Sequence, residues 1–224
     1  MYDDSSETAD APSLEENIEQ LESLYDVIDH RHALSILRIN YRDQLAELLG
    51  ALLNLRLTDS MLTAPGGNES RIPKLFSESL RPLGWKETRI TGDLLVSLAA
   101  KRTNATGTET SQFTIPSYLD GHKIDYVKGA VAFDLEWNAK DQTFDRDLYA
   151  MRAFYEANVI AAGVLVTRSA DLNGEFRRLG IMQKYGAATT WLGKLKPRLE
   201  ANRGGGCPVL ALGISRRLLD TENE

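Results

Sequence analysis

Three acidic side chains, Asp125, Asp134 and Glu136, fall within one short stretch of alternating apolar and polar residues, Ile124–Asn138. This stretch reads IDYVKGAVAFDLEWN. It predicts a β-hairpin with its turn at 128–129, because glycine tolerates the backbone angles of a tight turn. Successive side chains of a strand point to opposite faces, so Asp134 and Glu136 share one face of the second strand.

The predicted pairing brings the acid of the first strand onto the same face. A two-residue turn at 128–129 sets Asp125 opposite Ala132 and diagonally across from Asp134, and such neighbours lie roughly 7–8 Å apart at the backbone. Carboxylates this close repel each other unless a cation lies between them, and oxygen ligands favour a hard divalent ion, Mg²⁺ above all. The alternative is a solvated hairpin with acids on its wet face.

An acid, a gap and an acid-x-acid triplet on the next strand resemble the PD-(D/E)xK nucleases. The triplet here is Asp134-Leu135-Glu136, so glutamate stands where that motif usually has lysine. Over roughly residues 30–215, and most densely over 122–168, the sequence resembles the BglII/BamHI/BstYI group of type II restriction endonucleases. The segments GGNES at 66–70 and GGCPVL at 205–210 support the resemblance.

The resemblance implies an α/β fold in which a central mixed β-sheet is flanked by helices, the restriction endonuclease-like core. It also implies that Asp125 and Asp134 ligate Mg²⁺, together with a backbone carbonyl near Leu135. Glu136 would orient or deprotonate the attacking water, or share a second metal. A carboxylate crowded by two others has a raised proton affinity, which suits a base.

Three further residues are weighed for the active site. Because the motif lysine is absent, Lys128 or Lys140 is a candidate for neutralising the phosphate. Glu87, which closely follows a tryptophan, matches by position a residue that can help organise the site in this group. An exposed acid at a strand edge is the alternative for Glu87.

The implied activity is Mg²⁺-dependent hydrolysis of double-stranded DNA at a short palindromic site, which has a GATC centre in related enzymes. A palindrome has two-fold symmetry, so a homodimer that cuts both strands is expected. Two alternatives remain. One is a repair or recombination nuclease of the same fold, and the other is a non-catalytic DNA-binding protein whose acids only hold the hairpin.

Candidate DNA contacts lie after the triplet and in a second loop. Small and hydroxyl residues before a helix at about 190–202 can approach a groove and donate to bases or phosphates, although ordinary helix capping is the alternative. The candidate DNA-binding residues are Asn138, Lys140, Tyr185, Thr189 and Thr190.

Hydrophobic periodicity predicts the surrounding elements. Strand, helix and strand over 131–167 form a right-handed βαβ unit, with Asp145 as the helix N-cap. A Thr-, Gly- and Ser-rich stretch over 101–118 is expected to be a long loop, either an arm for DNA or a partner subunit or a plain excursion. The other expected elements are helices over 13–28, 41–56, 70–83 and 190–202 and strands over 91–98, 159–167 and 207–214.

Composition indicates one domain over 13–220, preceded by a disordered acidic segment, 1–12. The net charge is −6, but residues 1–30 hold ten acids and no Lys or Arg, so the remainder carries +4. Residues 168–217 alone carry +7, a candidate footprint for phosphates. The absence of an apolar run of about 20 residues predicts no membrane span, and a single cysteine fits the reducing cytoplasm.

Overall fold

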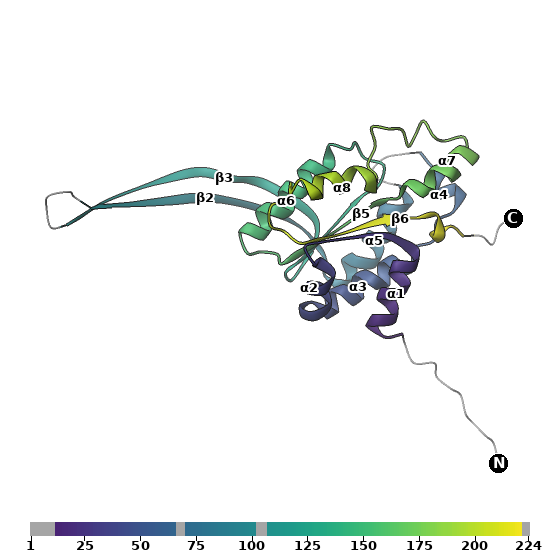
Figure 1. Ribbon diagram of the computed structural model, residues 1–224, viewed down its shortest axis with the longest axis horizontal. Helices are drawn as coiled ribbons and strands as arrows, with labels where there is room; N and C mark the ends of the chain where they lie inside the picture. The colour runs from purple at the N-terminus through teal and green to yellow at the C-terminus, as the bar shows by residue number, and fades with distance from the viewer. Residues whose placement is uncertain (1–11, 66–69, 102–106, 221–224) are drawn as a thin grey trace, which may run out of the picture.

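The computed structural model describes residues 12–65, 70–101 and 107–220. In this part of the chain, six strands form one sheet in the order β1-β6-β5-β4-β3-β2. Strands β4, β5 and β6 run parallel, whereas β1, β3 and β2 run antiparallel to their neighbours. The predicted α/β fold with a central mixed sheet flanked by helices is confirmed (Figure 1).

The elements have the following bounds. The strands are β1 (Tyr25–His30), β2 (Lys86–Lys101), β3 (Thr108–Lys128), β4 (Val131–Glu136), β5 (Ala162–Arg168) and β6 (Val209–Ile214). The helices are α1 (Leu14–Leu24), α2 (Ala33–Asn40), α3 (Arg42–Leu53), α4 (Asp59–Thr63), α5 (Arg71–Leu80), α6 (Thr143–Glu156), α7 (Asn173–Arg178) and α8 (Leu192–Glu200). Short 3₁₀ turns cover Arg81–Leu83, Ala170–Leu172 and Arg216–Leu218.

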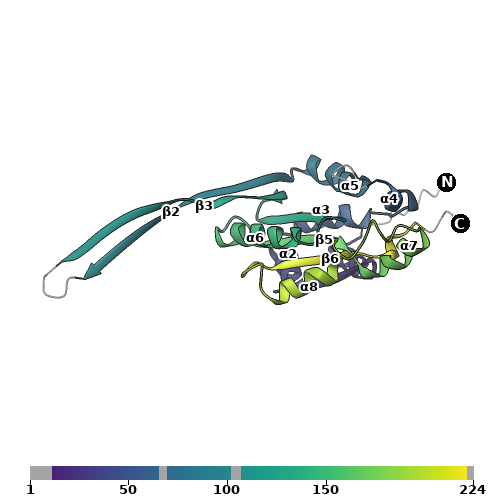
Figure 2. The same ribbon diagram turned by 90° about the horizontal axis from the view of Figure 1, so that it is seen from above.

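Helices cover both faces of the sheet, so the core has two layers. The larger layer joins α1 to α5 and α7 to one face, and the smaller one joins α6 and α8 to the other. Figure 2 shows α5 and α8 on opposite sides of the sheet. Along β4, Val131 and Phe133 belong to the larger layer and Ala132 to the smaller. By alternation, Asp134 and Glu136 face the α6 side.

The hairpin forms, but the predicted register is wrong. Lys128 pairs with Val131, so the turn lies at 129–130, and Gly129 takes a positive φ of 57° there. Hairpin turns of two residues require such a φ, which glycine adopts without strain. The shift brings Asp125 beside Asp134 rather than diagonal to it.

The first helix is shorter than predicted. Its capping box is present, with Glu16 N–H donating to Ser13 Oγ at 3.2 Å, but the helix ends at Leu24. The next six residues form β1, which pairs antiparallel with β6. This segment pairs with the edge of β6 that β5 leaves unpaired. A helical period along 13–28 depends only on nearby residues, so it does not indicate a strand partner so far along the chain.

The stretch expected to be a loop, 101–118, is mostly strand. From Thr108 onward it belongs to β3, which pairs with β2 to form a long two-stranded ribbon (Figures 1 and 2). Threonines alternating with Phe113 and Ile115 have strong β-propensity, which accounts for the difference. The predicted strand over 91–98 is the middle of β2.

The βαβ unit of β4, α6 and β5 is confirmed, with β4 and β5 parallel. Its helix begins at Thr143, and Gln142 rather than Asp145 is the N-cap. Asp145 lies in the first turn, where it accepts a hydrogen bond from Arg198 Nε at 3.1 Å.

Residues 1–11, most of the predicted acidic segment, and 66–69 of the GGNES segment lie outside the described residues. The division into 1–12 and 13–220 therefore stays a prediction. Among the helices described, none combines the length and apolarity needed to cross a bilayer.

Two neighbouring side chains of α2 test the larger core layer. Leu37 is fully buried, whereas Ile39 is 72% exposed. We expect Leu37→Ala to lower the free energy of unfolding by about 2–5 kcal/mol, because it leaves a cavity. Ile39→Ala, the matched control, should stay within about 0.5 kcal/mol of wild type. Urea unfolding followed by circular dichroism measures both, and equal effects would contradict the packing described.

Candidate active site

The carboxyl end of β4 opens into a cleft of about 880 Å³ between α5 and the start of α6. Four of the predicted site residues line it: Asp125, Leu135, Glu136 and Asn138. The cleft is also lined by the cationic residues Lys74, Arg81, Arg146 and Lys184. The acidic residues of the hairpin and these four cationic residues therefore line the same cleft.

Asp134 is buried beneath the cleft, and Asp125 lies at its exposed edge. The backbone N–H of Asp125 donates to Asp134 Oδ1 at 2.9 Å, directly beyond the last strand pair, Tyr126–Phe133. Burial, followed by the charges of Asp147 and Asp125, raises the pKa of Asp134 well above its ordinary value. The hairpin thus does bring the two predicted aspartates together.

Glu136 is also buried, and α6 holds both of its oxygens. Thr143 Oγ1 donates to one oxygen at 2.9 Å, and the guanidinium of Arg146 donates to the other at 3.1 Å. Burial and the neighbouring charge of Asp147 raise the pKa of Glu136 to about 9. The carboxyl group consequently retains its proton at neutral pH until a cation offsets the negative charge.

The sequence analysis missed Asp147, a buried acid of α6. One of its oxygens accepts two hydrogen bonds from Arg146, at 2.8 and 2.9 Å, while Oδ2 has no partner among the described residues. Burial raises its pKa, although hydrogen bonding with Glu136 and then the charge of Arg146 oppose the rise. A signal was available, because Asp147 interrupts the apolar stripe formed by Phe144, Leu148 and Met151.

The cation beside these acids is Arg146, which the sequence analysis also missed. Its side chain is 67% exposed at the cleft while its guanidinium contacts Glu136 and Asp147. The predicted alternative, Lys128, is instead paired with Glu47, on the side of the hairpin where Trp85 Nε1 also donates to Glu47. Lys140 is exposed but does not line the cleft.

The end of β4 is fastened by two threonines. Thr167 Oγ1 and Thr190 Oγ1 both donate to the backbone carbonyl of Glu136, at 2.9 and 3.0 Å. Thr190 is fully buried, so its hydroxyl serves the protein interior and not a DNA-facing surface.

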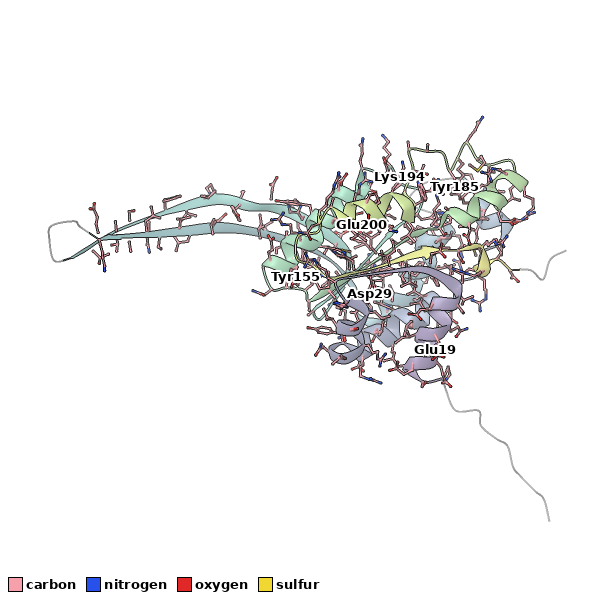
Figure 3. All side chains as sticks on the ribbon, viewed as in Figure 1. Glu19, Asp29, Tyr155, Tyr185, Lys194 and Glu200 are labelled. Atoms are coloured by element: carbon pink, nitrogen blue, oxygen red, sulfur yellow. The ribbon has the colours of Figure 1, made fainter. Side chains whose placement is uncertain are left out.

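Two other predicted DNA contacts are likewise engaged internally. Tyr185 is buried, stacks on Phe176 with ring centroids 3.9 Å apart, and donates to the Leu62 carbonyl at 3.0 Å. Figure 3 labels Tyr185 near α7, the helix that carries Phe176. Thr189 Oγ1 donates to Gly186 O at 2.8 Å and accepts from Arg168. Of the five predicted contacts, Asn138 is the one that lines the cleft, with a positive φ of 57°.

Glu87 lies apart from the cleft. It stands on β2, exposed, and pairs across the ribbon with Lys123 at 2.8 Å. Lys123 lowers the pKa of Glu87. The structure thus gives Glu87 the surroundings of an exposed strand-edge acid, since the cross-strand lysine holds it away from the other carboxyls.

The predicted phosphate footprint over 168–217 is largely neutralised within the protein. Arg168 is buried, and five other cations form ion pairs with acids from distant segments. These pairs are Arg178–Asp59, Lys194–Asp141, Arg198–Asp145, Arg203–Asp145 and Arg217–Asp26. The local charge of +7 therefore overstates what this segment offers to DNA.

A family model described as restriction endonuclease BglII/BglIII matches residues 25–214. This chain belongs to that family. The matched range begins at the first residue of β1 and ends at the last residue of β6, so it spans the whole sheet. No sequence among curated proteins matches the chain. The resemblance inferred from the hairpin is confirmed, and the cleft belongs to a restriction endonuclease fold.

Whether this BglII/BglIII-family site suits a metal can be judged from its donors. Within residues 12–65, 70–101 and 107–220, no three His, Cys, Asp or Glu side chains stand gathered as a ready metal-binding group. The donor chemistry fits a hard cation, because the oxygens are carboxylates and Asp147 Oδ2 is buried without a partner. Burial and the neighbouring carboxyl charges raise the pKa values of these acids, and a divalent cation can take the place of their protons.

The buried carboxyls predict an unusual dependence of stability on pH. Because the pKa of Glu136 is higher folded, at about 9, than its ordinary 4.5, its contribution is full below pH 4.5 and is lost as pH rises toward 9. In chelator, we expect Glu136→Gln to flatten this decline and to stabilise the protein at pH 8 by about 1–3 kcal/mol.

Glu87→Gln provides the matched control, since it makes the same change at an exposed acid whose pKa is lowered. It should leave the pH profile of the melting temperature unchanged. Thermal unfolding between pH 5 and pH 9 measures all three proteins. An unaltered profile for Glu136→Gln would show that this carboxyl ionises normally.

Proposed function

We propose that this protein is a Mg²⁺-dependent type II restriction endonuclease that hydrolyses double-stranded DNA at a short palindromic site. The observation that carries the proposal is a set of buried carboxyls, Asp134, Glu136 and Asp147, beneath a cleft whose wall bears Lys74, Arg81, Arg146 and Lys184. Phosphate binding needs the cations, and phosphodiester hydrolysis needs the acids.

Asp125 and Asp134 would hold the metal, with the backbone carbonyl of Leu135. The chemistry that a divalent cation would supply there is charge that polarises the scissile phosphate and stabilises the leaving 3′-oxygen. Glu136, positioned by Thr143 and Arg146, orients or deprotonates the attacking water. Its raised pKa gives the carboxylate a high proton affinity, so it can accept a proton from water once a bound cation has displaced its own. Asp147 adds negative charge that favours the cation.

Arg146 supplies the positive charge that lysine supplies in the usual motif. It contacts Glu136 at 3.1 Å, the position that replaces the lysine, and most of its side chain is exposed to the cleft. When a cation neutralises the carboxyls, the guanidinium can turn toward a phosphate oxygen without leaving a buried acid unpaired.

A homodimer follows from the symmetry of the substrate, because two equivalent cuts in a palindrome require two equivalent active sites. The family resemblance favours a recognition site with a GATC centre. Asn138 is the candidate for reading a base at the cleft, and Lys140 for contacting the backbone nearby.

The central test is cleavage of plasmid DNA with Mg²⁺. We expect discrete bands from wild type and a loss of at least about a thousandfold in rate for Asp134→Ala, because the metal site is lost. Glu87→Ala, an acid removed outside the cleft, should cut at the wild-type rate. Sequencing the ends then reveals the site and the overhang.

Other outcomes of this experiment support the rival functions. Undiminished cutting by Asp134→Ala contradicts the proposed site. A preference for junctions or free ends, without discrete bands, indicates a repair or recombination nuclease. DNA binding that is equal in EDTA and never accompanied by nicking indicates a non-catalytic protein.

Arg146 is tested against a neighbour on the same helix. We expect Arg146→Ala to lower kcat by about 10²–10³, and Arg146→Lys to retain part of the activity, because the charge contributes to the transition state. Arg152→Ala, which removes an exposed arginine paired with Glu156, should leave kcat unchanged. Single-turnover cleavage measures the rates, and equal rates for both alanine variants would exclude the assigned role.

A further inference from the structure

Beyond the body of the protein, β2 and β3 continue as a ribbon that no other element covers. Figures 1 and 2 show it leaving the helices and the rest of the sheet, and Figure 3 shows side chains projecting from it. The outer part pairs Leu94–Lys101 with Thr108–Ile115. Eight residues at 3.3 Å each give this part a length of roughly 26 Å.

The two strands of the ribbon differ in regularity. The register shifts between Ile90 and Leu94 place extra residues in β3, where Gly121 and Ser117 have positive φ. At one of these irregularities, the backbone N–H of Ser117 donates to Asp93 Oδ1 across the ribbon at 2.8 Å. Strand β2 therefore alternates without interruption, and its even-numbered residues share one face.

This even-numbered face is apolar. Leu94 lies opposite Ile115, and Val96 lies opposite Phe113, so apolar side chains pair directly across the strands. We call the set Leu94, Val96, Leu98, Phe113 and Ile115 the outer apolar face. Leu98 and Phe113 are 53% and 50% exposed.

The reverse side of the same ribbon is mostly polar. It carries Ser97 opposite Gln112, whose amide donates to the serine hydroxyl at 2.9 Å, and Leu95 opposite Thr114. The ribbon is thus amphipathic, as a sheet is when one face packs against protein and the other meets water.

Nearer the body, the even-numbered face of β2 is covered. Ile90 packs against the core layer of α6 and α8. Beyond Ile90, the same face of β2 continues into the outer apolar face, which no described helix or strand covers. A two-stranded ribbon is at best marginally stable alone in water, and an apolar patch of this kind marks a docking surface.

The charges of the outer ribbon argue against DNA as the occupant. In the described residues of its two paired segments, the charged side chains are Glu109, opposite Ala100 on the even-numbered face, and Lys101, opposite Thr108 on the reverse side, so the apolar side carries no cation. DNA backbone contacts depend on Lys and Arg, and apolar side chains contribute little to them. The occupant is therefore protein.

We propose that the outer apolar face docks on the same face of a second copy of this chain. An uncharged apolar strip is complementary to itself under a two-fold axis, and two such ribbons stack like the sheets of a β-sandwich, about 10 Å apart. The choice of partner rests on the proposed homodimer, and the docking surface goes beyond it.

Sedimentation equilibrium of the full chain, without DNA or Mg²⁺, tests the proposal. We expect wild type to dimerise at micromolar concentration and Leu98→Thr combined with Phe113→Thr to raise the dimer Kd at least tenfold. Threonine keeps the β-propensity of the strand. Leu95→Thr is the matched control, since Leu95 is 62% exposed on the reverse side, and it should change Kd less than twofold.

A second measurement needs no variant. Hydrogen exchange of wild-type amides over Leu94–Ala100 should slow as protein concentration rises through Kd, because docking protects the ribbon. A monomeric wild type, an unchanged Kd in the double variant, or exchange independent of concentration would each overturn the proposal. So would weaker DNA binding by the double variant with its mass unaltered, which assigns the face to DNA.

Failure of the docking surface and failure of the proposed activity remain distinguishable. Plasmid cleavage is assayed separately on the same preparations. A dimer that forms through the ribbon but never cuts DNA supports the docking surface and contradicts the nuclease proposal. An enzyme that cuts DNA but dimerises through another surface supports the nuclease proposal and contradicts the docking surface.

Discussion

The burial of three carboxyl groups between β4 and α6 is the constraint on which the site depends. Asp134, Glu136 and Asp147 lie out of water, and Arg146 donates to two of them. Burying charge without full compensation is costly, so the pKa values of all three groups are raised, and the surrounding core must supply the stability that they remove. Such a conflict between stability and function is expected at an active site, and a bound cation would relieve it here.

The sheet provides the rigidity that this arrangement needs. Strand β4 is held between β3 and β5, its carboxyl end is fastened by the hydroxyls of Thr167 and Thr190, and α6 returns directly over it. Sites at the carboxyl ends of strands are common in α/β sheets, because loops and helix starts gather there. The ribbon of β2 and β3 extends the same sheet outward, so the element that carries Asp125 at its base also carries the outer apolar face.

The charges of this protein are distributed and paired locally, so the net charge does not describe any one surface. The chain is acidic as a whole, yet cations line the cleft, and most of the basic residues after Arg168 are paired with acids from other segments. Net charge and local charge counts are therefore poor guides to where a polyanion can bind. The geometry of the cleft is the better guide, because it shows which cations face a common space.

The amino-acid sequence by itself determined the local features: the period-two alternation that puts Asp134 and Glu136 on one face, the βαβ unit, and the motif that indicates the family. Only the tertiary structure decided the register of the hairpin, which the positive φ of Gly129 sets, and the strand state of 25–30, which depends on β6 far along the chain. It also decided that Asp147 and Arg146 join the site and that Glu87 does not. The physical reason is that alternation and helical period report neighbours along the chain, whereas burial, ion pairing and strand partnership are energies between segments that the chain brings together only on folding.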